Sequence, residues 1–361
     1  MAYRVIQWGT GAVGKHTLRA VLDHPELELV GLKVYSEAKL GRDAGELADR
    51  PATGIRAVRD MADLPLSAAD CVLYVPMQPD YDEIAALLRA GVSVITTAGN
   101  MYPQTHGEEV VDKLQAACLV GASVFHGSGI NPAFMSDVLP LTLSGLSYRA
   151  QRIIVQEVSD VAHYASKAPG IMMDHIGFGK TPHEALRPDN PFIAWMSAYF
   201  RESMQMIADH LGATLERVED NHEVAIARER VVLSPDCAIE AGTVACRRFE
   251  WSGIVNGRPA IILRTYWKTT LDIEPAWPIG SEKEVEWTIT IEGTPSFQCK
   301  VSTCASFDPA NPRYNRGGEE AAVIATGIHA VNAIPWVCTA QPGIRTFLDL
   351  PIIGSFGALW H

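Results

Sequence analysis

The first part of the chain alternates short apolar runs with amphipathic stretches. Apolar strands of four to eight residues recur, and segments with helical spacing of apolar positions lie between them. The predicted strands are 3–8, 28–35, 55–59, 70–75, 92–97 and 123–126, and the predicted helices are 13–23, 81–89 and 108–118. Strands that alternate with helices in this way predict a parallel sheet with helices on both faces.

Beyond Pro132 the pattern changes. An apolar helix is predicted over 134–146, a strand over 151–157 and a helix with aromatic residues near 194–211. Long alternating segments then follow one another at 222–233, 243–255, 260–272, 284–292 and 297–305. Successive strands without helices between them predict an antiparallel sheet.

A glycine motif lies between the first strand and the first helix. In Gly9-Thr10-Gly11-Ala12-Val13-Gly14, the first glycine allows a tight turn, the second lets the backbone approach a pyrophosphate, and the third lets helix and strand pack closely. The N-terminus of the helix presents free N–H groups to phosphates. The motif favours dinucleotide binding over a plain structural turn. Ligands of such sheets bind at the carboxyl ends of the strands, which adds as candidate cofactor residues Val75, Pro76, Thr97, Ala98, Gly99 and Asn131.

These patterns predict an α/β fold. It comprises an N-terminal Rossmann domain with a parallel sheet over residues 1–135 and an α+β substrate and dimerisation domain with a largely antiparallel sheet over 136–309. A C-terminal helix, 319–334, and the tail to residue 361 are expected to return to the Rossmann domain, so that 310–361 forms a third segment.

The loop after the second strand bears on the choice of cofactor. NAD sites usually carry an acid there, which binds the ribose 2′-hydroxyl. This loop has Ser36, Lys39 and Arg42, and a hydroxyl with two cations suits a 2′-phosphate. NADP(H) is therefore the preferred cofactor. Glu37 keeps NAD(H) possible, and the alternative that Lys39 and Arg42 are solvated loop charges stays open.

Composition excludes several classes of function. A formal net charge of −12 and a pI near 5.4 argue against binding to nucleic acid or to an anionic membrane surface. The first strand begins at once and we find no apolar run of about 18 residues, so we expect a cytoplasmic protein without a signal or membrane span. The cysteines and histidines lack the spacing of a zinc site, and we expect no metal. A small molecule is the expected partner.

Three stretches carry a family resemblance. Gln7–Gly14, Tyr35–Glu46 and Gly127–Pro132 together resemble the dihydrodipicolinate reductase-like superfamily, and more narrowly its branch of 2,4-diaminopentanoate dehydrogenase and native NAD(P)-dependent amine dehydrogenases. The resemblance implies a Rossmann domain, a second domain for substrate and dimerisation, and a homodimer. It also implies hydride transfer between nicotinamide and a carbon bonded to nitrogen or oxygen.

The resemblance further implies a glutamate between the fifth strand and a Tyr-Pro pair. This chain has no acid between Thr97 and Tyr102-Pro103, and Glu108 and Glu109 come later and are expected to open the next helix. Proton-transfer candidates therefore come from elsewhere.

Four side chains are candidates for that role. Lys167 lies in a loop similar to the proton-donor loop of the reductases. It is a candidate because a desolvated lysine can donate a proton near neutral pH. His163 belongs to the same loop, Tyr102 has a phenol that can protonate an alkoxide, and His175 is an acid/base candidate. Each has a structural alternative: a surface lysine, an aromatic packed at a turn, or a core histidine.

The second domain is rich in bulky apolar residues, which favours a small hydrophobic substrate over a dicarboxylate. Alternatively, these residues form ordinary core and dimer contacts. They are Phe178, Phe192, Trp195, Met196, Tyr199, Phe200 and Met204. The sequence predicts an NAD(P)-dependent oxidoreductase acting on a ketone, imine, amine or alcohol, and the competing hypothesis is a non-catalytic NADP(H)-binding sensor or scaffold.

Overall fold

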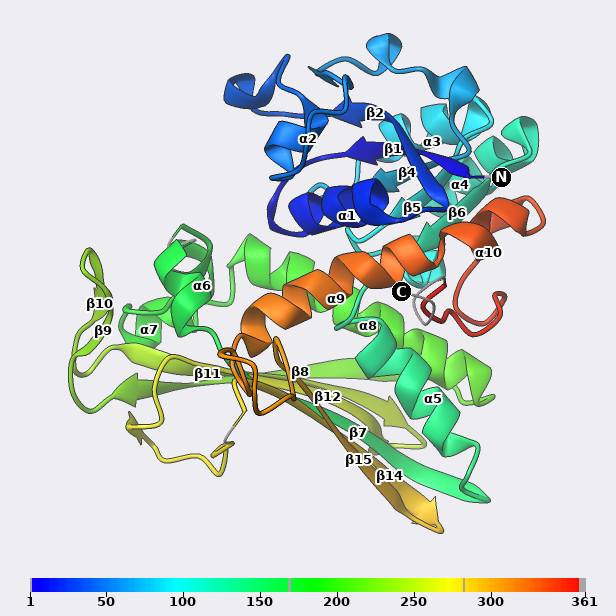
Figure 1. Ribbon diagram of the computed structural model, residues 1–361. Coiled ribbons are helices and arrows are strands. Elements are labelled where there is room, and N and C mark those ends of the chain that lie inside the picture. The colour runs from blue at the N-terminus through cyan, green and yellow to red at the C-terminus, as the bar shows by residue number, and fades with distance from the viewer. Residues whose placement is uncertain (1, 168–169, 282, 357–361) are drawn as a thin grey trace. The chain divides into compact units, whose positions relative to one another are not determined.

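The computed structural model describes residues 2–167, 170–281 and 283–356 (Figure 1). By their internal contacts, residues 1–134 and 323–361 form a first compact unit and residues 135–322 a second. The sequence-based boundaries lie after residues 135 and 309. The chain returns to the first unit later than predicted, at residue 323. The reason is local: the amide of Gly318 donates to Glu284 Oε2 at 2.7 Å and holds the start of α9 (Gly318–Asn332) in the second unit.

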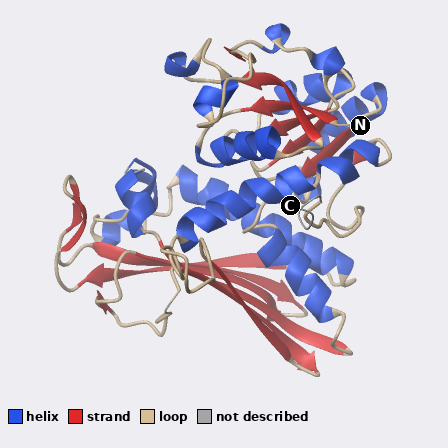
Figure 2. Ribbon diagram, in the orientation of Figure 1, coloured by secondary structure: helices blue, strands red, loops and turns tan. Residues whose placement is uncertain are grey.

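The first unit contains a seven-stranded sheet in which every pair of strands is parallel (Figure 2). The order across it is β16 (Gly343–Ile344), β6 (Val124–Gly127), β5 (Ser93–Thr96), β4 (Cys71–Tyr74), β1 (Tyr3–Trp8), β2 (Leu27–Lys33) and β3 (Ala57–Val58). The predicted Rossmann sheet is confirmed, with β16 from the C-terminal tail as a further edge strand.

Helices bury both faces of this sheet. On one face, α1 (Ala12–Asp23) packs with the end of α9 and with α10 (Ile334–Thr339) around Val5, Leu73 and Ile95. On the other, α3 (Tyr81–Arg89) and α4 (Glu108–Gly121) pack against Ile6, Trp8 and Val94. The short α2 (Ala44–Leu47) follows β2, and Asp43 accepts the amide of Gly45 at its start.

The stretch Gly318–Thr339 is long and apolar enough to cross a membrane by length and composition alone. The sequence analysis did not identify this stretch, because it found no apolar run of about 18 residues. Core helices of globular domains meet the same criterion, and Ala330, Val331, Ile334 and Val337 are buried in the core of the first unit. This stretch is therefore weak support for a membrane span, and the cytoplasmic location stays a prediction.

The second unit contains a mixed sheet of seven strands. Its order is β13 (Ile273–Glu274), β8 (Arg217–Ala227), β11 (Val244–Val255), β12 (Arg258–Lys268), β7 (Arg149–Asp160), β14 (Val285–Thr294) and β15 (Phe297–Thr303). Neighbours are antiparallel except β12 and β7, which are parallel. The predicted largely antiparallel sheet is confirmed.

Helices cover one face of this sheet. The longest is α8 (Pro191–His210), which begins where Asn190 Oδ1 accepts the amides of Phe192 and Ile193. Phe200 of α8 stacks on Trp251 of β11 with ring centroids 3.9 Å apart, and this pair marks the covered face. The other helices are α5 (Leu139–Ser144), α6 (Ala162–Lys167), α7 (Pro182–Ala185) and the π-helices Phe134–Val138 and Gly170–Ile176.

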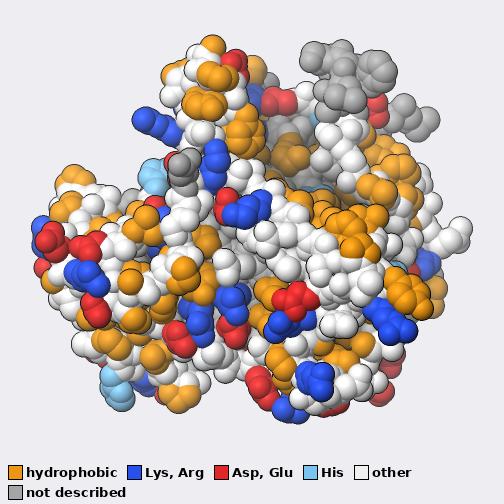
Figure 3. All heavy atoms as spheres, turned by 90° about the horizontal axis from the view of Figure 1, so that it is seen from below, with side chains coloured by type: hydrophobic (Ala, Val, Ile, Leu, Met, Phe, Trp, Pro, Cys, Tyr) orange, Lys and Arg blue, Asp and Glu red, His pale blue; other side chains and the backbone are white. Residues whose placement is uncertain are grey.

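The opposite face of the sheet carries cross-strand ion pairs. Arg248 pairs with Glu223 at 2.9 Å, and Arg264 pairs with Glu250. The face of the molecule presented in Figure 3 shows hydrophobic side chains mixed with acidic and basic ones. Homodimerisation stays a prediction.

Three predicted elements differ from the structure. The segment 222–233 forms two strands, β8 and β9 (Val231–Ser234), because residues 228–230 turn away, and β9 pairs with β10 (Cys237–Ile239). The segment 260–272 ends as a strand at Lys268. The apolar helix predicted over 134–146 is a π-helix followed by α5.

The stacking of Phe200 on Trp251 gives the first testable expectation. Replacing the fully buried Trp251 with alanine should lower the free energy of unfolding by about 3–5 kcal/mol, because a large cavity forms. Chemical denaturation followed by circular dichroism measures the change. The control Leu271→Ala removes a side chain that is 53% exposed and should change stability by less than about 0.5 kcal/mol. Equal effects of the two variants would contradict this assignment of the core.

Candidate functional site

The glycine turn lies between β1 and α1, where the strand order of the first sheet reverses. β1 has β2 on one side and β4 on the other. Ligands of doubly wound sheets bind at this switch point. Gly9 has a φ of +96°, a conformation that favours glycine, and its amide donates to the Lys33 carbonyl at 2.9 Å.

Close packing of the backbone explains the spacing of the glycines. A Cβ added to Gly14 would lie 2.4 Å from the Gly9 carbonyl oxygen, whereas one added to Gly11 would meet nothing within 4 Å. Buried polar groups support the turn: Gln7 Nε2 donates to the Gly9 carbonyl at 2.8 Å, and Thr17 Oγ1 donates to Gln7 Oε1 at 2.9 Å. The backbone at Gly11 is therefore held in place and open to a ligand.

A cavity of about 390 Å³ opens at this turn. It brings together seven of the predicted cofactor residues, with Tyr35 and Met77: Gly9, Thr10, Gly11, Ser36, Lys39, Val75 and Pro76. Ala12, Val13 and Gly14 form the first turn of α1 beside it. Open glycine backbone, a helix N-terminus, a hydroxyl and a cation fit the phosphates of a dinucleotide.

The two cations of the loop after β2, Lys39 and Arg42, lie in different places. Lys39 lines the cavity, and its Nζ donates to the carbonyl oxygen and Oγ1 of Thr10 at 2.8 and 3.1 Å. Arg42 is not among the lining residues and pairs with Glu46 at 2.7 Å. Glu37 pairs with Arg59. Lys39 is thus the cation held against the glycine turn.

The loop after β5 is packed against the sheet. Ala98, Gly99 and Asn100 are buried and Thr97 is half-buried. Asn100 has a φ of +64°, and its Oδ1 accepts a hydrogen bond from the Tyr81 hydroxyl at 2.9 Å. A buried amide therefore occupies the stretch where relatives are expected to carry a glutamate.

The other predicted residues at this edge are Tyr102 and Asn131. Tyr102 is 9% exposed and immediately precedes the short 3₁₀ helix Pro103–His106. Asn131 lies half-buried beyond the end of β6.

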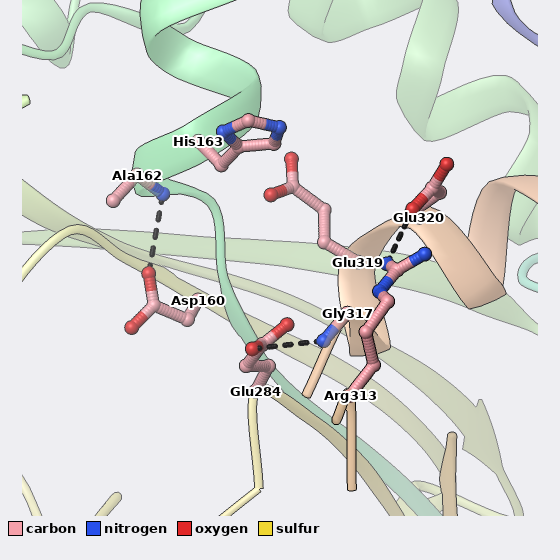
Figure 4. Close-up of a pocket in the computed structure, with 8 residues that line it drawn as sticks. All are labelled: Asp160, Ala162, His163, Glu284, Arg313, Gly317, Glu319 and Glu320. Carbon is pink, nitrogen blue, oxygen red and sulfur yellow. Dashed lines mark hydrogen bonds and ion pairs between the residues drawn. The ribbon is translucent and has the colours of Figure 1, made fainter. Parts of the chain in front are cut away.

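His163 lies in the second unit, on the first turn of α6. It lines a cavity of about 400 Å³, and in Figure 4 its ring and the Glu319 carboxylate point toward each other. The other lining residues are Asp160, Ala162, Glu284, Arg313, Gly317 and Glu320. Four carboxylates thus surround one imidazole and one guanidinium.

Most of these carboxylates have structural tasks. Asp160 pairs with Lys268 at 3.1 Å and accepts the amide of Ala162. Glu284 accepts the amides of Gly317 and Gly318, and Glu320 pairs with Arg313 at 2.6 Å. The cavity is polar, and one of the carboxylates that line it, Glu284, fixes the start of α9.

His175 lies elsewhere in the second unit. It is exposed on the π-helix Gly170–Ile176 and stacks on Phe192 with centroids 5.2 Å apart. It lines a different cavity, of about 360 Å³, with Asp174, Lys180 and other charged residues. The structure does not bring His163 and His175 into one cavity. Lys167 ends the backbone of α6, and its side chain lies outside the described residues.

Two buried ionisable groups in the second unit were not identified by the sequence analysis. Burial raises the pKa of the Asp137 carboxyl to about 8, although Ser203 Oγ donates to it at 2.9 Å. Burial lowers the pKa of Arg247 to about 10. The sequence did contain a signal for Asp137, because it is an acid within the mostly apolar run Phe134–Leu146. The run was interpreted as an apolar helix, and the acid was not considered.

In the first unit, the sequence analysis also did not identify a buried histidine, His126, and a half-buried one, His329. Burial lowers the pKa of both His126 and His329 to about 4. His126 Nδ1 lies 2.7 Å from the Arg345 carbonyl, and His329 Nδ1 lies 3.1 Å from Ser128 Oγ. Both imidazoles are neutral near pH 7 and tie the C-terminal tail and α9 to β6.

Comparison with known proteins identifies the family. The family profile described as the 2,4-diaminopentanoate dehydrogenase C-terminal domain matches residues 134–358. An amine dehydrogenase of Streptomyces virginiae is 30% identical over 368 aligned residues, covering 98% of both chains. The chain belongs to the 2,4-diaminopentanoate dehydrogenase family. The 2,4-diaminopentanoate dehydrogenase of Acetoanaerobium sticklandii is 26% identical over 97% of this chain and 93% of its own.

A solved structure shares the fold of this family member. The amine dehydrogenase from Mycobacterium smegmatis superposes with a TM-score of 0.74 at 18% identity, over 98% of both chains. The resemblance found in the sequence is confirmed, and the chain is an oxidoreductase enzyme with homologues that act on small molecules. Among the residues the structure describes, no group of three or more His, Cys, Asp or Glu side chains could hold a metal.

Asp137 gives an expectation about pH. Its folded pKa of about 8 lies above the ordinary value of 3.8, so its protonation stabilises the folded state fully below about pH 4. This contribution falls as the pH rises toward 8, by up to about 1.4 kcal/mol per pH unit. The difference in unfolding free energy between wild type and Asp137→Asn should therefore change over that range. A difference that stays constant between pH 4 and 8 would show that Asp137 is not protonated in the folded protein.

Proposed function

We propose that this enzyme oxidises the carbon bonded to the amino group of a small hydrophobic amine with NADP⁺, and catalyses the reverse amination of a carbonyl compound. The observation that carries the proposal is the cavity at the glycine turn, in a chain whose whole length matches an amine dehydrogenase. When bound, the nicotinamide cofactor supplies the acceptor or donor of hydride. The protein supplies binding, orientation and the movement of protons.

The residues of the glycine turn would hold the phosphates of the cofactor. Gly9, Thr10 and Gly11 offer the backbone, and the N-terminus of α1 offers free N–H groups. Val75 and Pro76 line the same cavity from the end of β4. For the ends of β5 and β6, we retain Thr97, Ala98, Gly99 and Asn131 as proposed cofactor residues.

The preference for NADP(H) is proposed from the same cavity. Lys39 and Ser36 are a cation and a hydroxyl that suit a 2′-phosphate. The loop's acid, Glu37, is engaged by Arg59. NAD(H) stays possible as a second cofactor.

Aromatic side chains along α8 support a hydrophobic substrate. The rings of Phe192 and Trp195 lie 5.2 Å apart, and those of Trp195 and Tyr199 lie 5.0 Å apart. All three are half-buried, whereas Phe178, Met196, Phe200 and Met204 are buried core residues. Of the bulky residues predicted to line the substrate site, Phe192, Trp195 and Tyr199 are therefore the ones accessible to a substrate.

Carbonyl reduction without ammonia is the second candidate reaction. It is favoured by the missing acid between Thr97 and Pro103, because reduction of a ketone needs a proton donor and no partner for an ammonium group. Tyr102, His163, Lys167 and His175 are the proposed donors for either reaction.

Turnover measurements with the purified enzyme separate these possibilities. NADPH consumption is followed with hydrophobic ketones and aldehydes, with and without ammonia, and NADP⁺ reduction with the corresponding amines. Turnover that requires ammonia, together with amine oxidation, is the expected result. Turnover without ammonia would establish carbonyl reduction instead. Tight NADPH binding without turnover on any compound would establish a sensor.

A pair of variants tests the cofactor assignment. Lys39→Ala should weaken NADPH binding at least about tenfold, the loss of about 1.4 kcal/mol expected for a charged contact, and should weaken NADH binding less. Arg42→Ala is the matched control and should leave both affinities within about twofold, since Arg42 pairs with Glu46. Fluorescence titration measures all four affinities. Equal losses for NADPH and NADH in Lys39→Ala would mean that Lys39 only supports the turn.

A further inference from the structure

An aromatic ring lies open in the cavity at the glycine turn. Tyr35 follows the end of β2 and lines this cavity together with Gly9 and Gly11. The residue is 52% exposed. Met77, which is 61% exposed, lines the same cavity from the stretch after β4. A flat ring and a thioether side chain, each following a different strand, thus border the space where we propose that the cofactor binds.

The hydroxyl end of the Tyr35 side chain is anchored in the core. Trp8 Nε1 donates a hydrogen bond to the Tyr35 hydroxyl oxygen at 2.9 Å, and Trp8 is fully buried at the end of β1. A ring that is already held loses little conformational freedom when a ligand packs on it. Tyr35 is therefore exposed without being free to turn away.

A buried lysine lies against the same ring. Lys33 Nζ lies 4.2 Å from the centroid of the Trp8 ring and 4.4 Å from that of the Tyr35 ring. It also pairs with Glu83 Oε1 at 2.9 Å, and the Tyr74 hydroxyl donates to Glu83 Oε2 at 3.0 Å. The negative faces of the rings and the carboxylate stabilise the buried ammonium. Because the cation covers one face of the Tyr35 ring, the exposure of the ring falls on the other face.

This support is more than a surface tyrosine needs. Single exposed aromatic side chains are ordinary on proteins, but removing a lysine from water is costly. Here Lys33 is only 6% exposed and lies between two rings, one of which lines a cavity. The arrangement holds one aromatic face toward that cavity.

The neighbours of Tyr35 indicate which part of a dinucleotide would use this face. Ser36 and Lys39 line the same cavity and are the proposed contacts of the 2′-phosphate. In NADP(H) the 2′-phosphate and the adenine base are attached to the same ribose, whereas nicotinamide lies across the pyrophosphate. Adenine is flat and stacks on aromatic side chains. The base attached to the nearest ribose is therefore the group that fits Tyr35.

We propose that Tyr35 is the platform on which the adenine base of the cofactor stacks, and that the Lys33–Glu83 pair positions its ring. This inference rests on the proposed cofactor site. Lys33 is a positioning residue, because it contacts Tyr35 and not the base. The platform adds affinity for NADPH and NADH alike, whereas Lys39 distinguishes between them. Tyr35→Leu should therefore weaken both cofactors equally.

The two halves of the cofactor test the platform without turnover. Adenosine 2′,5′-bisphosphate and nicotinamide mononucleotide are titrated separately into the full-length enzyme, with affinities from calorimetry and ligand signals from ¹H NMR. In wild type the adenine H2 and H8 signals should shift upfield, because an aromatic ring shields protons stacked on its face. Tyr35→Leu should abolish these shifts and weaken adenosine 2′,5′-bisphosphate at least about tenfold. Its affinity for nicotinamide mononucleotide should stay within about twofold.

Two further variants and a control complete this test. Tyr35→Phe keeps the ring and loses only the bond from Trp8, so it should retain the upfield shifts. Tyr148→Leu is the matched control, because Tyr148 is 81% exposed in the second unit, and it should bind both halves as wild type does. Circular dichroism verifies that each variant is folded.

The positioning role of Lys33 is tested by removing both charges of its ion pair. Lys33→Met combined with Glu83→Gln leaves neither charge unpaired and should weaken adenosine 2′,5′-bisphosphate about fivefold, the loss of a cation–π contact. Lys33→Arg with Glu83 intact keeps a cation between the rings and should restore affinity to within about twofold. Equal losses for the two halves of the cofactor in the double variant would mean that the pair only stabilises the fold.

The outcomes separate this inference from the proposed function. If wild type oxidises no amine but the adenine shifts occur and require Tyr35, the platform stands and the proposed reaction fails. If wild type oxidises amines and Tyr35→Leu binds adenosine 2′,5′-bisphosphate as wild type does, the reaction stands and the platform fails. Absence of the upfield shifts in wild type at saturating adenosine 2′,5′-bisphosphate would overturn the platform even if Tyr35→Leu did not fold. Shifts of the nicotinamide signals that require Tyr35 would overturn it as well.

Discussion

Backbone contact between Gly9 and Gly14 is the constraint on which the first unit depends. Because an added Cβ at Gly14 would lie 2.4 Å from the Gly9 carbonyl, only glycine lets α1 start this close to the end of β1. That closeness sets the helix N-terminus beside the turn and leaves Gly11 open. The buried bonds from Gln7 and Thr17 then fix the turn in one conformation. The phosphate site that we propose at this turn would thus depend on packing, before any charged side chain takes part.

Much of the architecture was predictable because local patterns and tertiary structure agree. Helical stretches such as 81–89 bury the face that their apolar positions indicate, and the strand 3–8 is buried on both faces over residues 5–8, as a central strand of a parallel sheet is. The helices Ala162–Lys167 and Gly170–Ile176 were not predicted, because the glycine and proline residues of this stretch of sequence signal a loop. The glycine turn could be found from one contiguous motif, and the other candidate cofactor residues from the ends of later strands. The hydrogen bonds to Glu157 could not be predicted, because Trp267 and Trp287 lie more than a hundred positions away and meet it only through strand register.

The proposed cofactor site and the loop after β5 are built on different physical grounds. The glycine turn relies on absent side chains and exposed backbone dipoles, which suit a large, charged cofactor. The loop after β5 relies on a buried amide, because Asn100 Oδ1 accepts a hydrogen bond from the Tyr81 hydroxyl and holds the backbone against the sheet.

The discontinuous first unit has a consequence for the order in which the chain acquires structure. Ala330, Val331, Ile334 and Val337 complete the core that Val5, Leu18 and Leu73 begin, and β16 pairs with β6 at the edge of the sheet. During synthesis, the first 134 residues therefore emerge with an uncovered apolar face. They stay incomplete while nearly two hundred residues of the second unit are made. The core of the first unit is therefore completed only after residues 330–344 have been made, which follow the whole of the second unit.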